Sequence, residues 1–268
     1  MELNKIYCMD AKKGLKLLPD DYIDLTVTSP PYDDLRTYEG YSFDFEPIAK
    51  ELYRVTKPGG VVVWVVGDAT VKGSETGTSF RQALYFRDEC GFNLHDTMIW
   101  EKPGFSAVGA LATRYAPVFE YMFILTKGRL ETFNPLKDRR VLHSDAVLTG
   151  TIRNKEGTTK RKSGEGKRYG VGGYGQRYNI WKINPQSQRD NHPAPFPEQL
   201  AQDHILSWSN PGDIVLDPFM GSGTTGKMAA LNRRHYIGFD ISEEYCEIAR
   251  KRIAEHTAQQ NIFSLGVE

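Results

Sequence analysis

The stretch DIVLDPFMGSGTTG, residues 213–226, joins an apolar run to a glycine-rich turn. The apolar half is typical of a buried strand, and the glycines follow with the spacing G-x-G-x-x-G. Glycine allows the backbone to approach a ligand closely, and a helix that begins after such a turn directs its amino end at the ligand. The stretch therefore predicts a strand, a cofactor-binding turn and a helix, in that order.

Two classes of cofactor fit this turn. Asp240 ends the next apolar run, where a carboxylate can bind the ribose hydroxyls of a dinucleotide such as NAD or FAD. Asp217, however, ends the strand before the turn, and a carboxylate there attracts a cation and repels a pyrophosphate. S-adenosyl-L-methionine carries a sulfonium, an ammonium and an adenosine, so it would use both carboxylates. We therefore expect S-adenosyl-L-methionine, with a dinucleotide or a turn without a ligand as alternatives.

Apolar runs and helical spacings alternate along the chain. We expect strands at residues 4–9, 23–28, 61–66, 97–101, 120–126, 213–217 and 236–240, and helices at residues 11–18, 45–55, 80–90, 196–208, 224–232 and 243–256. This alternation predicts an α/β fold with a doubly wound, mainly parallel, Rossmann-like sheet. Only about forty residues follow the glycine turn, so the other strands come from the amino-terminal part and the strand order is permuted.

The second unusual segment is TSPPY, residues 28–32, at the end of the strand expected at residues 23–28. Its two prolines each fix φ at about −65° and bring no N–H donor, which holds the carbonyl of Pro30 in place. With the Ser29 hydroxyl, this carbonyl can accept hydrogen bonds from the exocyclic amine of a nucleobase. The ring of Tyr32 offers a surface on which a flipped base can stack. Taken alone, the segment also fits an exposed turn, but in a parallel sheet it would lie on the same edge as the glycine turn.

Length and composition place the chain among ordinary globular proteins. Its 268 residues fit one large α/β domain with an insertion, and 40% of them are hydrophobic and 25% charged. No stretch approaches the ~18 apolar residues of a membrane-spanning helix, so we expect a cytoplasmic protein without a membrane partner. The three cysteines are far apart and the six histidines lack ligand spacing, so we expect neither a disulfide framework nor a metal site.

The formal net charge of zero hides a segregation of charge along the sequence. Residues 153–189 contain ten Lys or Arg and two Glu, and four aromatic residues lie among the cations: Tyr169, Tyr174, Tyr178 and Trp181. Cations and flat rings suit the phosphate backbone and the unstacked bases of a nucleic acid, whereas a solvated loop is the alternative. The candidate DNA-binding residues of this window are Lys160, Arg161, Lys162, Lys167 and Arg168.

TSPPY followed by DPFMGSGTT, residues 217–225, resembles the DNA amino-methyltransferases of bacterial and phage restriction–modification systems, in the beta arrangement of that family. MIWEKPGF, FEYMFILTKG and NHPAPFPEQL, at residues 98–105, 119–128 and 191–200, are similar to further segments of the family. The resemblance covers most of the chain. It implies a catalytic half at residues 1–128, a basic target-recognition insertion at residues 129–190 and a half that binds S-adenosyl-L-methionine at residues 191–268.

The resemblance also implies an activity and residue roles. The activity is methyl transfer from S-adenosyl-L-methionine to the exocyclic amine of a flipped base in double-stranded DNA. The implied catalytic residues are Ser29, Pro30 and Tyr32. The implied cofactor-binding residues are Asp10, Asp217, Phe219, Gly221, Gly223, Thr224, Asp240 and His192, of which Asp10 equally suits a helix cap. Trp100 and Lys102 are implied to line the base pocket, although a tryptophan in a strand is more often part of the core.

The expected target base depends on one residue. Ser29 stands where many adenine-modifying members of the family have Asp, which favours cytosine N4 over the alternative, adenine N6. The resemblance also allows a cognate restriction endonuclease and a homodimer as partners. The alternatives from other classes are a dinucleotide-dependent oxidoreductase and a non-catalytic DNA-binding module.

Overall fold

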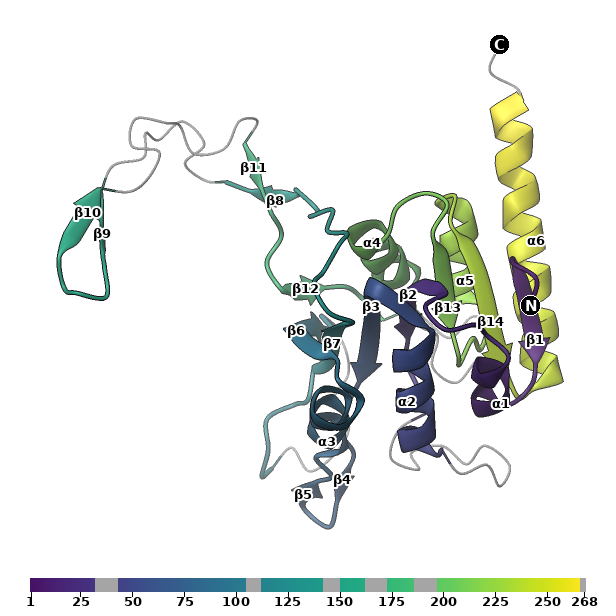
Figure 1. Cartoon of the computed structure of the whole chain (residues 1–268), viewed down its shortest axis with the longest axis horizontal. Coiled ribbons are helices and arrows are strands. Elements are labelled where there is room, and N and C mark those ends of the chain that lie inside the picture. Colours follow the sequence, from purple (N-terminus) through teal and green to yellow (C-terminus); the bar gives the residue numbers. More distant parts are fainter. Residues whose placement is uncertain (32–42, 105–111, 142–149, 162–172, 186–196, 266–268) are drawn as a thin grey trace. The chain divides into compact units, whose positions relative to one another are not determined.

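The computed structural model describes residues 1–31, 43–104, 112–141, 150–161, 173–185 and 197–265. The chain forms two compact units, one of residues 1–134 with 179–268 and one of residues 135–178 (Figure 1). The smaller unit lies within the insertion expected at residues 129–190, and residues 179–185 return to the larger unit. No helix of the described residues is both long enough and apolar enough to cross a bilayer.

A mixed eight-stranded sheet organises the larger unit, with the order β1-β14-β13-β2-β3-β7-β6-β12 (Figure 1). The strands are β1 (Lys5–Cys8), β2 (Ile23–Thr28), β3 (Thr56–Val66), β6 (Asn93–Glu101), β7 (Phe119–Thr126), β12 (Ile180–Lys182), β13 (Ile214–Asp217) and β14 (His235–Asp240). β7 runs antiparallel to its neighbours β3 and β6, and the other pairings of this sheet are parallel. The expected mainly parallel α/β sheet is thus confirmed.

The strand order confirms the predicted permutation. β13 and β14, which come late in the sequence, lie between β1 and β2 from the amino-terminal part. The registers place Cys8 opposite Asp240 and Thr26 opposite Leu216. Because these four strands run in parallel, their carboxyl ends lie on one edge of the sheet.

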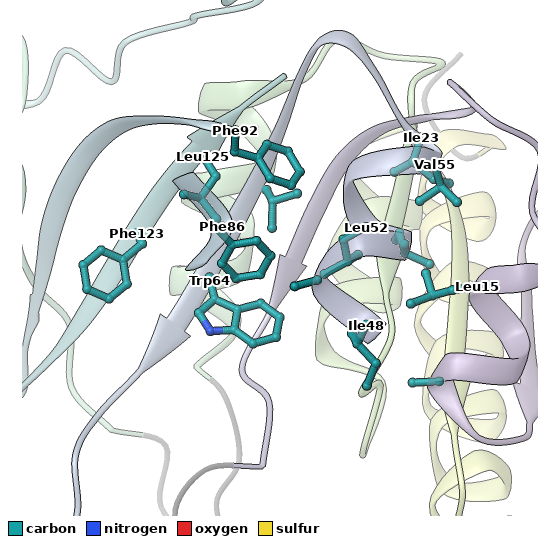
Figure 2. Packing of buried hydrophobic residues seen from close by; sticks show 14 of the residues in the cluster. Leu15, Ile23, Ile48, Leu52, Val55, Trp64, Phe86, Phe92, Phe123 and Leu125 are labelled. Carbon is teal, nitrogen blue, oxygen red and sulfur yellow. The ribbon is translucent and has the colours of Figure 1, made fainter. Parts of the chain in front are cut away.

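Helices pack against the sheet and bury its apolar side chains. They are α1 (Ala11–Lys16), α2 (Phe45–Val55), α3 (Thr78–Tyr85), the π-helical turn η1 (Phe86–Cys90), α4 (Glu198–Trp208), α5 (Thr224–Leu231) and α6 (Glu243–Leu265). One core contains Leu15 of α1, Leu52 of α2, Trp64 of β3 and Phe86 of η1 (Figure 2). α4, α5 and α6 pack against each other and against strands β1, β2, β13 and β14.

Several element boundaries differ from the prediction. β3 begins at Thr56 instead of Val61, because Thr56 already pairs with Ile23 of β2. α6 continues to Leu265, beyond the predicted end at residue 256. β12 was not predicted, yet it pairs with β6 in the central sheet.

The remaining strands form small two-stranded antiparallel sheets. In the smaller unit, β8 (Arg139–Arg140) pairs with β11 (Tyr174–Gly175), and β9 (Thr151–Arg153) pairs with β10 (Thr159–Arg161). The turn between β9 and β10 is closed by Asn154, whose Oδ1 accepts hydrogen bonds from the N–H and the hydroxyl of Thr158, both at 2.9 Å. In the larger unit, β4 (Thr70–Val71) pairs with β5 (Ser74–Glu75).

Candidate cofactor and catalytic site

The two segments that stand out in the sequence follow adjacent strands. β2 ends at Thr28 and is followed by Ser29 and Pro30, whereas β13 ends at Asp217 and is followed by the glycine loop, residues 218–223. β2 and β13 pair in parallel. Both segments therefore leave the same edge of the sheet, as expected from the sequence.

A buried hydrogen bond joins the two segments. The hydroxyl of Thr28 donates to Oδ1 of Asp217 over 2.7 Å, between residues 189 positions apart in the chain. The same oxygen accepts the N–H of Phe219 at 3.0 Å, and the hydroxyl of Thr225 donates to the carbonyl of Val27 at 3.2 Å. Sequence reasoning missed Thr28 and Thr225 as site residues, although each lies inside one of the two motifs. The Thr28–Asp217 and Thr225–Val27 hydrogen bonds fix the start of the Ser29 segment relative to the glycine loop.

Asp217 is a buried carboxylate at the centre of this junction, with 5% of its surface exposed. Burial raises its pKa to about 6, although the hydroxyls of Thr28 and Thr225 and the N–H of Phe219 act in the opposite direction. At neutral pH the group is therefore a carboxylate held by donors from both motifs. This fixed negative charge next to the glycine loop suits a cationic ligand.

The conformation of the loop favours glycine at residue 221 and requires it at residue 223. Gly221 and Gly223 have φ values of 51° and 85°, in the left-handed region. A Cβ on Gly223 would lie 2.7 Å from Cβ of Ala249 in α6, which is too close for any side chain. The N–H of Gly223 donates to the carbonyl of Met220 at 2.9 Å, which closes a tight turn just before α5.

Asp240 holds the glycine loop from the neighbouring strand. Its carboxylate accepts the N–H of Gly221 at 2.8 Å and the N–H of Ser242 at 2.9 Å. Asp10 lies next to the end of this strand, because the N–H of Met9 donates to the Asp240 carbonyl at 2.8 Å. Asp10 also caps α1 by accepting the N–H of Lys13 at 3.1 Å. The expected contacts of the two carboxylates with a nucleoside stay predictions.

The expected catalytic residues are described in part. Ser29 is half-buried and Pro30 is buried directly after β2. Tyr32 lies outside the described residues, as does His192. The structure therefore places Ser29 and Pro30 at the carboxyl end of β2. The roles of Ser29, Pro30, Tyr32 and His192 stay predictions.

Trp100 and Lys102 lie at the end of β6, farther along the sheet. Trp100 is 5% exposed, and its indole N–H donates to the carbonyl of Ile183 at 2.8 Å. Lys102 pairs with Glu120, and its ammonium lies 4.4 Å from the centre of the Trp100 ring. The structure thus gives Trp100 a packing role, and the expected contact of both residues with a base stays a prediction.

The basic window divides between the two units. Lys160 and Arg161 are exposed on β10 of the smaller unit, whereas Lys162, Lys167 and Arg168 lie outside the described residues. The prediction that Trp181 lies among DNA-facing aromatics is wrong. It belongs to β12, is 5% exposed and stacks on the ring of His204 with a centroid distance of 4.5 Å.

The residues of this edge fit S-adenosyl-L-methionine. The loop bends tightly at Gly223, where a side chain would clash with α6, directly before the amino end of α5. Two carboxylates, Asp217 and Asp240, flank that turn from neighbouring strands. Fold and site together define an enzyme of the Rossmann-like class that binds a nucleoside-containing cofactor at the carboxyl ends of its strands.

Comparison with known proteins identifies the family. The model of a family described as DNA methylase, which groups N6 and N4 methyltransferases, matches residues 23–251. The chain belongs to this family. It is 58% identical over 248 residues to the orphan methyltransferase M.BamHII of Bacillus amyloliquefaciens, covering 88% of this chain and 91% of that protein.

Two solved structures have the same fold. The putative DNA modification methylase TTHA0409 of Thermus thermophilus, complexed with S-adenosyl-L-methionine, is 25% identical, with a TM-score of 0.64 over 94% of both chains. The cytosine-N4-specific PvuII DNA methyltransferase is 22% identical, with a TM-score of 0.67 over 95% of this chain and 91% of that one. Family membership and the cofactor of the Thermus protein support the cofactor expected from the sequence.

Proposed function

We propose that this protein transfers a methyl group from S-adenosyl-L-methionine to the exocyclic amine of a flipped base at specific sites in double-stranded DNA, with cytosine N4 as the target. The observation that carries the proposal is the 2.7 Å hydrogen bond between Thr28 and Asp217. It joins the segment suited to an amine to the loop suited to the cofactor. A methyl transferase needs both in one site, because proximity and alignment of the reacting groups supply much of the rate.

Separate residues of the chain bind the cofactor and the amine. When bound, S-adenosyl-L-methionine supplies an electrophilic methyl group on its sulfonium. Asp217, Asp240 and the glycine loop hold the cofactor, the first by its negative charge and the second at the ribose. The Ser29 hydroxyl and the Pro30 carbonyl accept hydrogen bonds from the amine. These bonds favour a tetrahedral nitrogen. Its lone pair is then no longer delocalised into the ring of the base and can attack the methyl carbon.

DNA is bound by the basic window of the smaller unit. Lys160 and Arg161 lie on an exposed two-stranded ribbon, a shape that the major groove admits. Their charges release counterions from the phosphate backbone. The ring of Tyr32, from the same segment as Ser29 and Pro30, provides a surface on which the flipped base stacks. A cognate endonuclease and a homodimer stay predictions from the sequence.

Ser29 favours cytosine N4 over adenine N6, because many adenine-modifying members of the family have Asp at this position. The family that matches this chain groups N6 with N4 enzymes, so adenine N6 is the second candidate. A serine hydroxyl is also a weaker acceptor than a carboxylate, which leaves more of the amine's binding to the Pro30 carbonyl.

The test is methyl transfer by the purified protein. Unmethylated DNA is incubated with S-adenosyl-L-methionine labelled in its methyl group, and the modified bases are identified by mass spectrometry and by sequencing that detects methylation at single bases. N4-methylcytosine at a defined site supports the proposal. N6-methyladenine would overturn the choice of base, and a bound dinucleotide without methyl transfer would overturn the activity.

A further inference from the structure

Beside the glycine loop, three charged side chains from three helices meet. Glu198 begins α4, Lys227 lies in α5 and Arg252 lies in α6. The ammonium of Lys227 lies 2.7 Å from Oε1 of Glu198, and the guanidinium of Arg252 donates to the same oxygen. The side chains of Lys227 and Arg252 are only 6% and 13% exposed. The single carboxylate of Glu198 balances one of the two positive charges and accepts hydrogen bonds from both cations, which makes their burial tolerable.

The Arg252 guanidinium also binds the loop itself. Its Nη1 donates to the carbonyl and the hydroxyl of Ser222, at 3.2 and 3.1 Å, and to the hydroxyl of Thr224 at 3.2 Å. Ser222 and Thr224 flank Gly223, the residue with a φ of 85°. Nη1 of the planar guanidinium therefore binds the residues on both sides of Gly223. Nη2 of the same group is fixed by Glu198.

The cluster is ionised and anchored. Burial alone would raise the pKa of Glu198, but hydrogen bonds from Lys227 and Arg252 outweigh burial and hold that pKa below its usual value. α6 is also in contact with the loop one turn earlier, where Ala249 leaves no room for a side chain on Gly223. Arg252 therefore has a fixed position from which to hold Ser222 and Thr224.

We propose that Arg252, held by Glu198, is a positioning residue that keeps the glycine loop in the conformation that binds the cofactor. The inference rests on the proposed function, since it assigns the loop to S-adenosyl-L-methionine. A loop that is already ordered loses less conformational freedom when the ligand binds. Without the guanidinium, the Ser222 carbonyl loses this donor, and the cofactor must order the part of the loop that Asp240 does not hold.

The first test measures cofactor binding without DNA. The dissociation constant of S-adenosyl-L-methionine is determined by isothermal titration calorimetry for the wild type, Arg252→Gln and Arg252→Lys. We expect Arg252→Gln to weaken binding about tenfold or more, because several charge-assisted hydrogen bonds are lost. Arg252→Lys keeps the positive charge but lacks the planar guanidinium with its several donors, so it should recover only part of the affinity. The matched control is Lys251→Gln, a neighbouring cation that is 79% exposed, and it should bind as the wild type does.

A second readout separates positioning from general stability. With methyl transfer as the assay, Arg252→Gln should raise KM for S-adenosyl-L-methionine and leave kcat and KM for DNA close to the wild-type values. An unchanged dissociation constant, or an equal rise of both KM values, would overturn the inference. If Arg252→Gln does not fold, Glu198→Gln keeps the shape of the anchor but removes its charge, which also faces Lys227, and should weaken cofactor binding as well. An unchanged affinity in that variant would overturn it as well.

The wild-type protein distinguishes the two proposals in the same series. If it neither binds S-adenosyl-L-methionine nor methylates DNA, the proposed function fails, and the positioning role fails with it. If the wild type does both and the Arg252 variants bind the cofactor equally well, only the positioning role fails.

Discussion

At the level of single residues, Thr28 and Thr26 offer a controlled comparison, because both are buried threonines of β2. The Thr28 hydroxyl donates to Asp217, whereas the Thr26 hydroxyl has no hydrogen-bond partner within the described parts of the chain. We expect Thr28→Val to lower the free energy of unfolding by about 2 kcal/mol, because it removes a donor from a buried carboxylate. Thr26→Val should leave it unchanged or raise it. Urea denaturation measures both, and equal effects would contradict the assigned role of Thr28.

Asp217 should make stability depend on pH in a specific direction. Its pKa is about 6 in the folded protein, against 3.8 for an unperturbed group. Between these values the folded protein keeps a proton that the unfolded chain releases. This group's contribution is therefore most favourable below pH ~4 and declines by about 3 kcal/mol as the pH rises to ~6, after which it is constant.

The comparison with Asp217→Asn isolates this contribution. The free energy of unfolding of the wild type, relative to that variant, should be higher at pH 4.5 than at pH 7, as measured by urea denaturation at each pH. A difference in unfolding free energy that does not vary with pH would mean that the pKa of Asp217 is not raised in the folded protein.

Ser29 is the residue on which the chemistry of the proposal depends most. We expect Ser29→Ala to lower kcat for methyl transfer about a hundredfold, which is typical for the loss of one polar group that stabilises a transition state. The affinity for S-adenosyl-L-methionine should stay the same, because the cofactor is held by other residues. Calorimetry of cofactor binding is the control for folding, and a variant with full activity would refute the catalytic assignment.

At the level of elements, the β9–β10 ribbon carries the expected contact with DNA. In its register, Lys160 lies opposite Ile152 and Arg161 lies opposite Thr151. The two cations are consecutive residues of β10, so they point to opposite faces of the ribbon. Replacement of Lys160, Arg161 and Lys162 by Ala should weaken DNA binding and reduce its salt dependence by roughly one unit of slope per lost phosphate contact.

Fluorescence anisotropy at several KCl concentrations measures that slope. Lys5→Ala with Lys251→Ala, which removes two exposed cations from the larger unit, is the comparison for a general loss of charge. The single variants Lys160→Ala and Arg161→Ala then report which face of the ribbon meets the phosphates. A triple variant with the wild-type slope would remove the ribbon from the DNA-binding surface.

The elements also show how far sequence patterns reach. β2 and α2 have the predicted bounds, because one is an uninterrupted run rich in β-branched residues and the other has a clear helical spacing. β12 has three residues, one of them charged, so it has no period that could be recognised. Trp181 is its one buried residue, and that burial depends on the pairing with β6 and on the ring of His204, neither of which the sequence pattern of this segment indicates.

At the level of the whole molecule, the order of the motifs was enough to predict the permuted sheet and the shared edge. Parallel strands place their carboxyl ends on one edge, so two segments that each follow such a strand share that edge. The partner of the Thr28 hydroxyl could not be predicted in this way, because it depends on the register between β2 and β13. The Arg252 contacts depend likewise on how α6 packs against the loop.

The central claim is that the Ser29 segment and the glycine loop form one active site around a methyl donor. A crystal structure of the protein with S-adenosyl-L-methionine bound tests it most directly. The account predicts density for the donor against the glycine loop, with its ribose at Asp240 and its methyl group directed at Ser29 and Pro30. Density at another edge of the sheet, or a methyl group directed away from Ser29, would contradict the account.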